Sequence, residues 1–135
     1  ILGIVTCLAV RMSASGEDSN SANSKLTSLR EERREVLKSR VDITENLVSI
    51  GKSTLDELDA ARGNLLDSEY ELTTSSEQRI GVLQRKLANA KQLEAVMTEK
   101  KQAGKGSEAE VLLAKARRLG VEIELDKEQE PRKKS

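Results

Sequence analysis

The sequence predicts an all-α protein of four helices, arranged as two related antiparallel hairpins of coiled-coil type. Apolar residues recur at three- and four-residue spacing, and no stretch alternates with the two-residue period of a strand. Glycines at Gly51 and Gly104 interrupt this pattern, and each is followed by the polar residues that favour a new helix start. Charged residues make up 34% of the 135, with one Tyr as the only aromatic, which is typical of long solvated helices.

The two ends of the chain are predicted to lie outside these hairpins. Residues 1–10 are apolar but span about half of the ~20 residues that a membrane helix needs. Small residues follow them, so residues 1–15 are expected to be a secretory signal whose removal would also remove Cys7. A buried first helix or a disordered apolar end is the alternative. Residues 16–24 are polar and predict a linker, and residues 129–135 predict a solvated charged tail.

The first hairpin is expected over residues 25–74. Its first helix should run over 24–50 and end at Gly51, a residue suited to a helix C-terminus. Ser53 and Asp56 have the spacing of a capping box that begins a second helix. Apolar residues of the first helix recur every seven positions at Leu29, Val36, Ile43 and Ile50. The expected packing face of the second helix comprises Leu58, Ala61, Leu65, Ser68 and Leu72.

The second hairpin is expected over residues 75–128. Ser75 and Gln78 predict the start of a third helix that ends at Gly104, and Ser107 with Glu110 predicts the capping box of a fourth. The expected packing face of the third helix comprises Ile80, Leu83, Leu87, Ala90, Leu93 and Met97. That of the fourth helix comprises Leu112, Ala116, Leu119 and Ile123.

The two glycine turns belong to an internal repeat. Residues 51–72 align without gaps on residues 104–125, and eight of the 22 pairs are identical. The turn, the cap and the apolar face coincide in the alignment, which favours duplication over chance similarity of two helices.

Both repeats carry the pattern G-x-x-(S/T)-x-x-(D/E)-(V/L)-x-x-A, and residues 30–127 resemble the TolC family of outer-membrane efflux proteins. The pattern occupies Gly51, Thr54, Glu57, Leu58 and Ala61, and then Gly104, Ser107, Glu110, Val111 and Ala114. The resemblance implies that the glycines mark hairpin tips that contact a periplasmic adaptor protein. The implied tip contacts are Gly51, Ser53, Thr54, Asp56, Glu57, Gly104, Ser107 and Glu110. Tips 53 residues apart leave no room for the aromatic-rich barrel strands of that family, so the resemblance implies a hairpin module and no channel.

Composition removes most other functional classes. Without His and with a single Cys, the chain offers no His-bearing zinc site, thiolate cage or Ser-His-Asp triad. Zero net charge predicts no nucleic-acid partner. The Gly51-Lys52-Ser53-Thr54 run lacks the earlier glycine and the strand of a phosphate-binding loop, because Asn46 stands five residues before Gly51. No catalytic group, cofactor or metal is therefore expected.

The sequence thus predicts a non-enzymatic protein of the periplasm or cell envelope that acts in protein–protein interaction or assembly. It would bind a protein partner or itself through its helix faces and hairpin tips. It would reach a membrane only through a partner or an uncleaved N-terminus. A cytosolic coiled-coil scaffold or regulatory adaptor is the alternative, and an enzyme ranks third because no site supports one.

Overall fold

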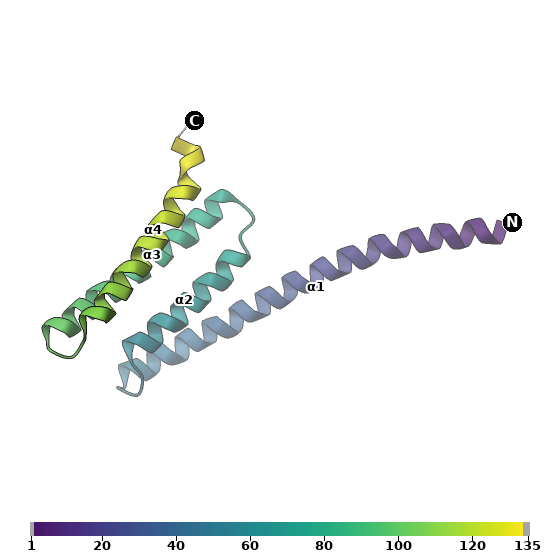
Figure 1. The fold of residues 1–135 in the computed structure, drawn as a ribbon. Coiled ribbons are helices and arrows are strands. Elements are labelled where there is room, and N and C mark those ends of the chain that lie inside the picture. The colour runs from purple at the N-terminus through teal and green to yellow at the C-terminus, as the bar shows by residue number, and fades with distance from the viewer. Residues whose placement is uncertain (1, 134–135) are drawn as a thin grey trace.

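The computed structural model describes the backbone of residues 2–133 and the side chains of residues 19–131. Four α-helices fill this part of the chain, which contains no strand, so the predicted all-α fold is confirmed (Figure 1). The helices are α1 (Leu2–Ser49), α2 (Leu55–Glu71), α3 (Ser76–Gln102) and α4 (Glu108–Lys133).

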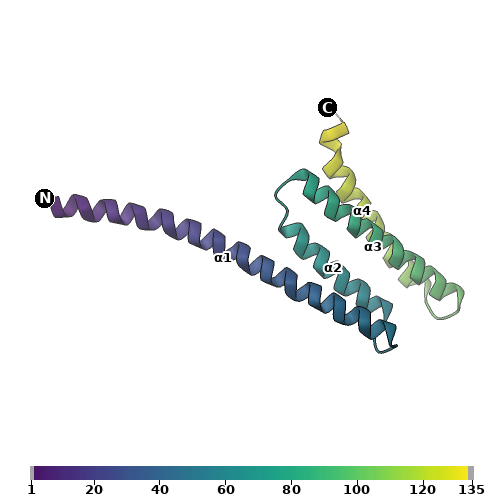
Figure 2. The same ribbon diagram turned by 180° about the vertical axis from the view of Figure 1, so that it is seen from behind.

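Consecutive helices pack against each other in an open row. The chain order is also the order in space, with α1 on α2, α2 on α3 and α3 on α4. Within residues 2–133 the backbones of α1 and α4 do not come into contact, so the row does not close into a four-helix bundle. The α1–α2 and α3–α4 turns lie at one end, and the α2–α3 connection lies at the other (Figures 1 and 2). Both hairpin tips therefore face the same direction.

Helix α1 is much longer than the helix that it packs on. Its 48 residues span about 72 Å, against about 26 Å for the 17 residues of α2. The expected helix start at Ser24 is wrong, because α1 continues without a break through residues 16–24. Side chains 19–32 are all exposed, so this stretch of α1 runs beyond the hairpin. The signal-peptide prediction falls on side chains outside the described residues and stays a prediction.

The α1–α2 hairpin encloses a small apolar core. Val41 of α1 packs with the buried Leu58 and Ala61 of α2, and the half-buried Val48 and Leu65 cover this cluster. Small Ala61 lets the two backbones approach closely, as antiparallel helix packing requires. The expected packing face of α2 is thus correct at its buried centre, with Leu65 and Leu72 at its half-buried margin.

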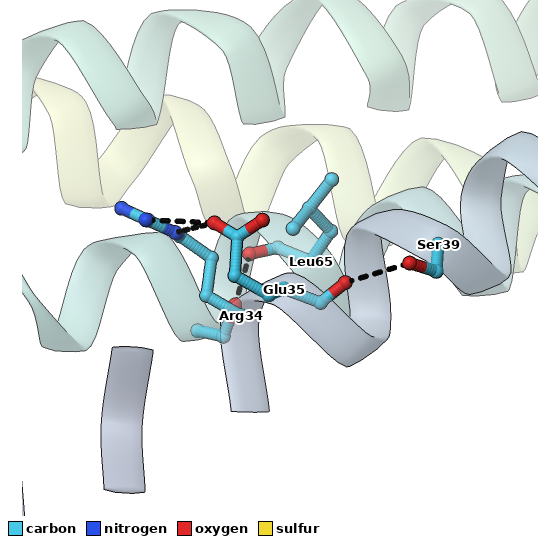
Figure 3. A network of polar contacts seen from close by, with 5 residues as sticks. Arg34, Glu35, Ser39 and Leu65 are labelled. Carbon is cyan, nitrogen blue, oxygen red and sulfur yellow. Dashed lines mark hydrogen bonds and ion pairs between the residues drawn. The ribbon is translucent and has the colours of Figure 1, made fainter. Parts of the chain in front are cut away.

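Polar side chains also interact with one another along α1. Figure 3 shows Arg34 turned onto the Glu35 carboxylate. The Arg34 Nη2 donates to Glu35 Oε1 at 2.8 Å, and Ser39 Oγ donates to the Glu35 carbonyl at 3.1 Å. Both of these side-chain contacts stay within α1.

Helix α3 follows most of its predicted face, although the buried Val82 lies outside that face. Leu83 is fully buried, and Ile80, Ala90 and Met97 are buried along the same face. Leu87, which belongs to the predicted face as well, is half-buried. The agreement arises because α3 has a neighbour on each side, so its large apolar residues are the ones that pack.

The predicted packing face of α4 is wrong. Helix α4 meets α3 through the buried Ala114 and Val121, whereas Leu112, Leu119 and Ile123 are 54%, 42% and 57% exposed. Small residues at the contact bring α4 close to α3, while the large residues point outward. The heptad residues of α1 behave in the same way. Those left exposed are Leu29, Val36, Ile43 and Ile50.

Candidate functional site: the two hairpin tips

Both tips begin with the same helix C-terminus. Gly51 and Gly104 adopt φ of 75° and 74°, a left-handed conformation that favours glycine. The Gly51 amide donates to the Val48 carbonyl at 3.0 Å, and the following amide donates to the Leu47 carbonyl at 2.8 Å. This is the Schellman pattern, which satisfies carbonyls that the helix end leaves free.

The second tip repeats these contacts at the same relative positions. The Gly104 amide donates to the Lys101 carbonyl at 3.0 Å, and the Lys105 amide donates to the Lys100 carbonyl at 2.8 Å. The two halves of the sequence repeat thus share a backbone geometry as well as residue types.

Each tip then closes with a capping box. In the first, Thr54 Oγ1 accepts from the Glu57 amide and Glu57 Oε2 accepts from the Thr54 amide, both at 3.2 Å. The box predicted on Ser53 and Asp56 is therefore wrong by one residue. Ser53 Oγ instead donates to the Glu57 carboxylate from outside the helix. The Thr54–Glu57 pair is the one that the repeated pattern itself contains.

The predicted box of the second tip is confirmed. Ser107 Oγ accepts from the Glu110 amide at 3.2 Å, and Glu110 Oε2 accepts from the Ser107 amide at 3.0 Å. The start of α3 is capped more loosely. Ser75 Oγ accepts from the Gln78 amide at 3.2 Å, but the Gln78 side chain accepts from Thr74 rather than from Ser75.

The first box also sets the charge of its carboxylate. The pKa of Glu57 lies below its ordinary value because two groups donate to the ionised carboxylate. The Ser53 hydroxyl has the larger effect and the Thr54 amide the smaller one. Glu57 is therefore an anion held in place at the positive end of α2.

The two tips are joined by one ion pair. Lys100 Nζ, in the last turn of α3, lies 3.4 Å from Asp56 Oδ2 in the first turn of α2. Each charge complements the dipole of its own helix end. Both side chains are well exposed, so the pair orients the tips more than it stabilises the fold.

A groove of about 240 Å³ opens between the tips, and we call it the tip groove. Of the predicted tip residues, it brings together Asp56 and Glu110; the other six, including both glycines, lie outside it on the turns. Leu93 and Met97 of α3 form its apolar floor. The remaining lining residues are Asp59, Ala60, Leu113, Ala114 and Arg117.

Asp59 is the residue of this groove that sequence reasoning missed. Its side chain is only 11% exposed; Asn89 Nδ2 donates to Oδ1 at 2.8 Å, and Arg117 Nη1 lies 3.1 Å from Oδ2. Burial raises the pKa of Asp59 above its ordinary value, although Arg117 and Asn89 oppose the shift. No local sequence signal indicates this role, because partners 30 and 58 residues away meet Asp59 only once three helices are packed.

The tip residues offer hydrogen-bonding groups and charge of both signs. Lys52 and Lys105 are exposed, one on each turn. Across the described side chains, no group of three or more His, Cys, Asp or Glu residues is placed to hold a metal ion. No helix in the described part of the chain has an apolar stretch long enough to cross a bilayer.

Comparisons with protein-family models, with curated proteins and with solved structures found no match to this chain. The site is therefore interpreted from its own geometry.

Proposed function

We propose that this chain is a non-enzymatic interaction module that binds a protein partner through its two hairpin tips together. The observation that carries the proposal is the pair of tips with one shared geometry at the same end of the molecule, joined by the Lys100–Asp56 ion pair. A partner that reached one tip would meet the second in a fixed position beside it.

Rigidity of the tips supports this proposal. A Schellman pattern and a capping box enclose each turn, so that few backbone groups have to be ordered on binding. The tip groove adds an apolar floor of Leu93 and Met97, which a partner side chain would bury.

The TolC-family resemblance of the tip pattern supports a more specific proposal. In that family, tips of this kind meet a periplasmic adaptor protein, so we place this chain in the cell envelope with an exported helical partner of adaptor type. It would act there in assembly and would form no channel itself. Recovery of an epitope-tagged chain from the cytosol, rather than from the periplasm or envelope, would favour the scaffold alternative.

Site-specific photocross-linking tests the tip assignment. A photoreactive amino acid in place of Lys52 or Lys105 should give covalent adducts with one partner. The same residue in place of Thr74, exposed in the α2–α3 connection at the opposite end, should give none. Equal adducts at Thr74 would contradict binding through the tips.

Reversal of the two lysine charges at the tips is a second test of binding through the tips. The double variant Lys52→Glu/Lys105→Glu alters exposed side chains and should leave helix content unchanged. Its affinity for the cross-linked partner should fall about tenfold, because two rim charges are reversed. Unchanged affinity would overturn the proposal.

A further inference from the structure

We propose that a second copy of this chain docks antiparallel on the outer face of α4. The face consists of Leu112, Ala116, Leu119 and Ile123, and we call it the α4 seam. Their spacings of four, three and four residues are those of the buried positions of a coiled coil. All four side chains are exposed, so the seam has no partner among side chains 19–131 of the same chain.

The seam points away from the rest of the molecule. Helix α4 contacts α3 through Ala114 and Val121, and at 100° per residue the seam lies on the far side of the helix from these two. A docking helix would therefore reach the seam without displacing α3.

An antiparallel pair fills the seam evenly. With Ala116 opposite Leu119 of the second copy, Leu112 falls opposite Ile123 of the second copy, and symmetry repeats both layers. Each small residue then faces a large one, which is the arrangement that leaves no gap in a two-helix interface. A parallel pair would instead place Ala116 against Ala116 and leave a gap at the centre.

The flanking charges fit the same orientation. In this register Lys115 faces Glu122 of the second copy on one side of the seam, and symmetry makes two such pairs. Glu122 already accepts from Arg118 Nη1 at 3.0 Å, and a carboxylate has the capacity to accept from a second donor.

The other side of the seam is apolar. There Leu113, which is 65% exposed, faces Gly120 of the second copy. A side chain built at Gly120 would meet nothing within 4 Å, so the space over this glycine is open to receive a leucine. Charge and volume thus agree on a second copy as the occupant.

The exposed heptad residues of α1 fit such an occupant less well. Arg33 and Arg40 alternate with Val36 and Ile43 on that face, and a charge at a central coiled-coil position weakens association. Arg33 is also paired within the chain to Glu71 of α2. Pairing of α1 with α4 of another copy alone would moreover be heterologous, and such a contact builds rings or open chains.

The expected dimer is weak. The seam covers about 17 Å of helix, or three turns, which is a smaller contact than that of a standard stable interface, so the dimer should be transient. Sedimentation over a wide concentration range should show a monomer–dimer equilibrium. A monomer at millimolar concentration or a series of higher oligomers would overturn the proposal.

Two substitutions, each of an exposed apolar residue by Glu, test whether the dimer forms through the α4 seam or through another exposed apolar face. Leu119→Glu should weaken dimerisation at least about 100-fold, because each copy would bury an unpaired carboxylate. Ile43→Glu, at a residue 60% exposed on α1, should leave the dissociation constant unchanged. Circular dichroism should show the same helix content in both variants. Equal loss in both would implicate α1 and contradict the assignment to α4.

Charge exchange tests the orientation. Lys115→Glu should weaken the dimer about tenfold by placing two like-charge pairs across the seam. Adding Glu122→Lys should recover most of the lost affinity, because the antiparallel register forms both pairs again with reversed sign, while each copy loses its Arg118–Glu122 pair. Absence of rescue would exclude this register. The tip variant Lys52→Glu/Lys105→Glu should still dimerise, so this inference and the proposed tip function fail separately.

Discussion

Gly51 and Gly104 stand where the chain reverses direction, and both need a left-handed backbone. Gly51→Ala or Gly104→Ala should each lower the free energy of unfolding by about 1–2 kcal/mol, because a Cβ strains that conformation. Gly81→Ala is the matched control. Gly81 lies inside α3, where an added Cβ would meet nothing within 4 Å, so alanine should raise the free energy of unfolding by up to about 1 kcal/mol. Urea titration measures both, and a loss at Gly81 would contradict this account.

Asp59 should make the stability of the protein depend on pH in an unusual direction. Its pKa is raised in the folded state, so the folded chain holds a proton that the unfolded chain has already lost. As pH rises from about 3.9 through the folded pKa, the wild type should therefore lose stability relative to Asp59→Asn. Urea titration of both proteins across this range should show the divergence.

Arg117 gives this prediction a second measurement. Arg117→Ala removes the cation that holds the Asp59 pKa down, so the pKa should rise further, and carbon-detected NMR titration of the carboxyl group reports it directly. Arg85→Ala, which removes a cation paired with Glu69 rather than Asp59, is the control. A fall in the Asp59 pKa on loss of Arg117 would contradict the packing described.

At the scale of a helix, α4 presents its small residues to α3 and its large residues to solvent. Ala114→Leu should therefore destabilise the fold by about 1–3 kcal/mol, because the added atoms have no space between the helices. Leu112→Ala removes a larger side chain but should change the free energy of unfolding of the monomer by less than about 0.5 kcal/mol. Thermal unfolding at low protein concentration compares them, and the opposite ranking would restore the face that the sequence predicted.

Helix identity could be predicted from the sequence, and helix faces only in part. The caps at Ser75 and Ser107 and both glycine ends are local signals, so they are found without knowledge of neighbours. The face of α3 was also predictable, since α3 has neighbours on both sides. The sequence of α4 contains two apolar faces. The face with the larger residues was predicted to be buried, whereas the structure buries the face of Ala114 and Val121.

The candidate site divides in the same way. The tip residues were predictable because turn and cap are encoded within a few positions, although Ser53 competed with Thr54 for the cap. The tip groove was not predictable, because Leu93, Asp59 and Arg117 come from three helices. Only tertiary packing brings them together.

At the scale of the whole molecule, the open row and the long α1 predict an extended particle. A helix of 48 residues alone sets a maximum dimension of at least about 70 Å. A compact globe of this length would have a radius of gyration of about 14 Å. Small-angle X-ray scattering at low concentration should give a maximum dimension of at least about 70 Å and a radius of gyration above about 14 Å. A radius of gyration near 14 Å would show that the row of helices closes into a bundle.

Residues 19–32 of α1 have a further consequence. Their side chains are all exposed, so hydrogen bonds within the helix and the helix–coil balance of the local sequence hold them helical, whereas Arg33 pairs with Glu71 of α2 and residues 37–48 share the hairpin core. Local opening of this stretch removes little tertiary contact and has a low free-energy cost. Its amides should therefore exchange with deuterium orders of magnitude faster than those of residues 37–48. A single continuous helix thus joins two segments of very different local stability, and a rise in temperature should lower the helix content of one while the other stays folded.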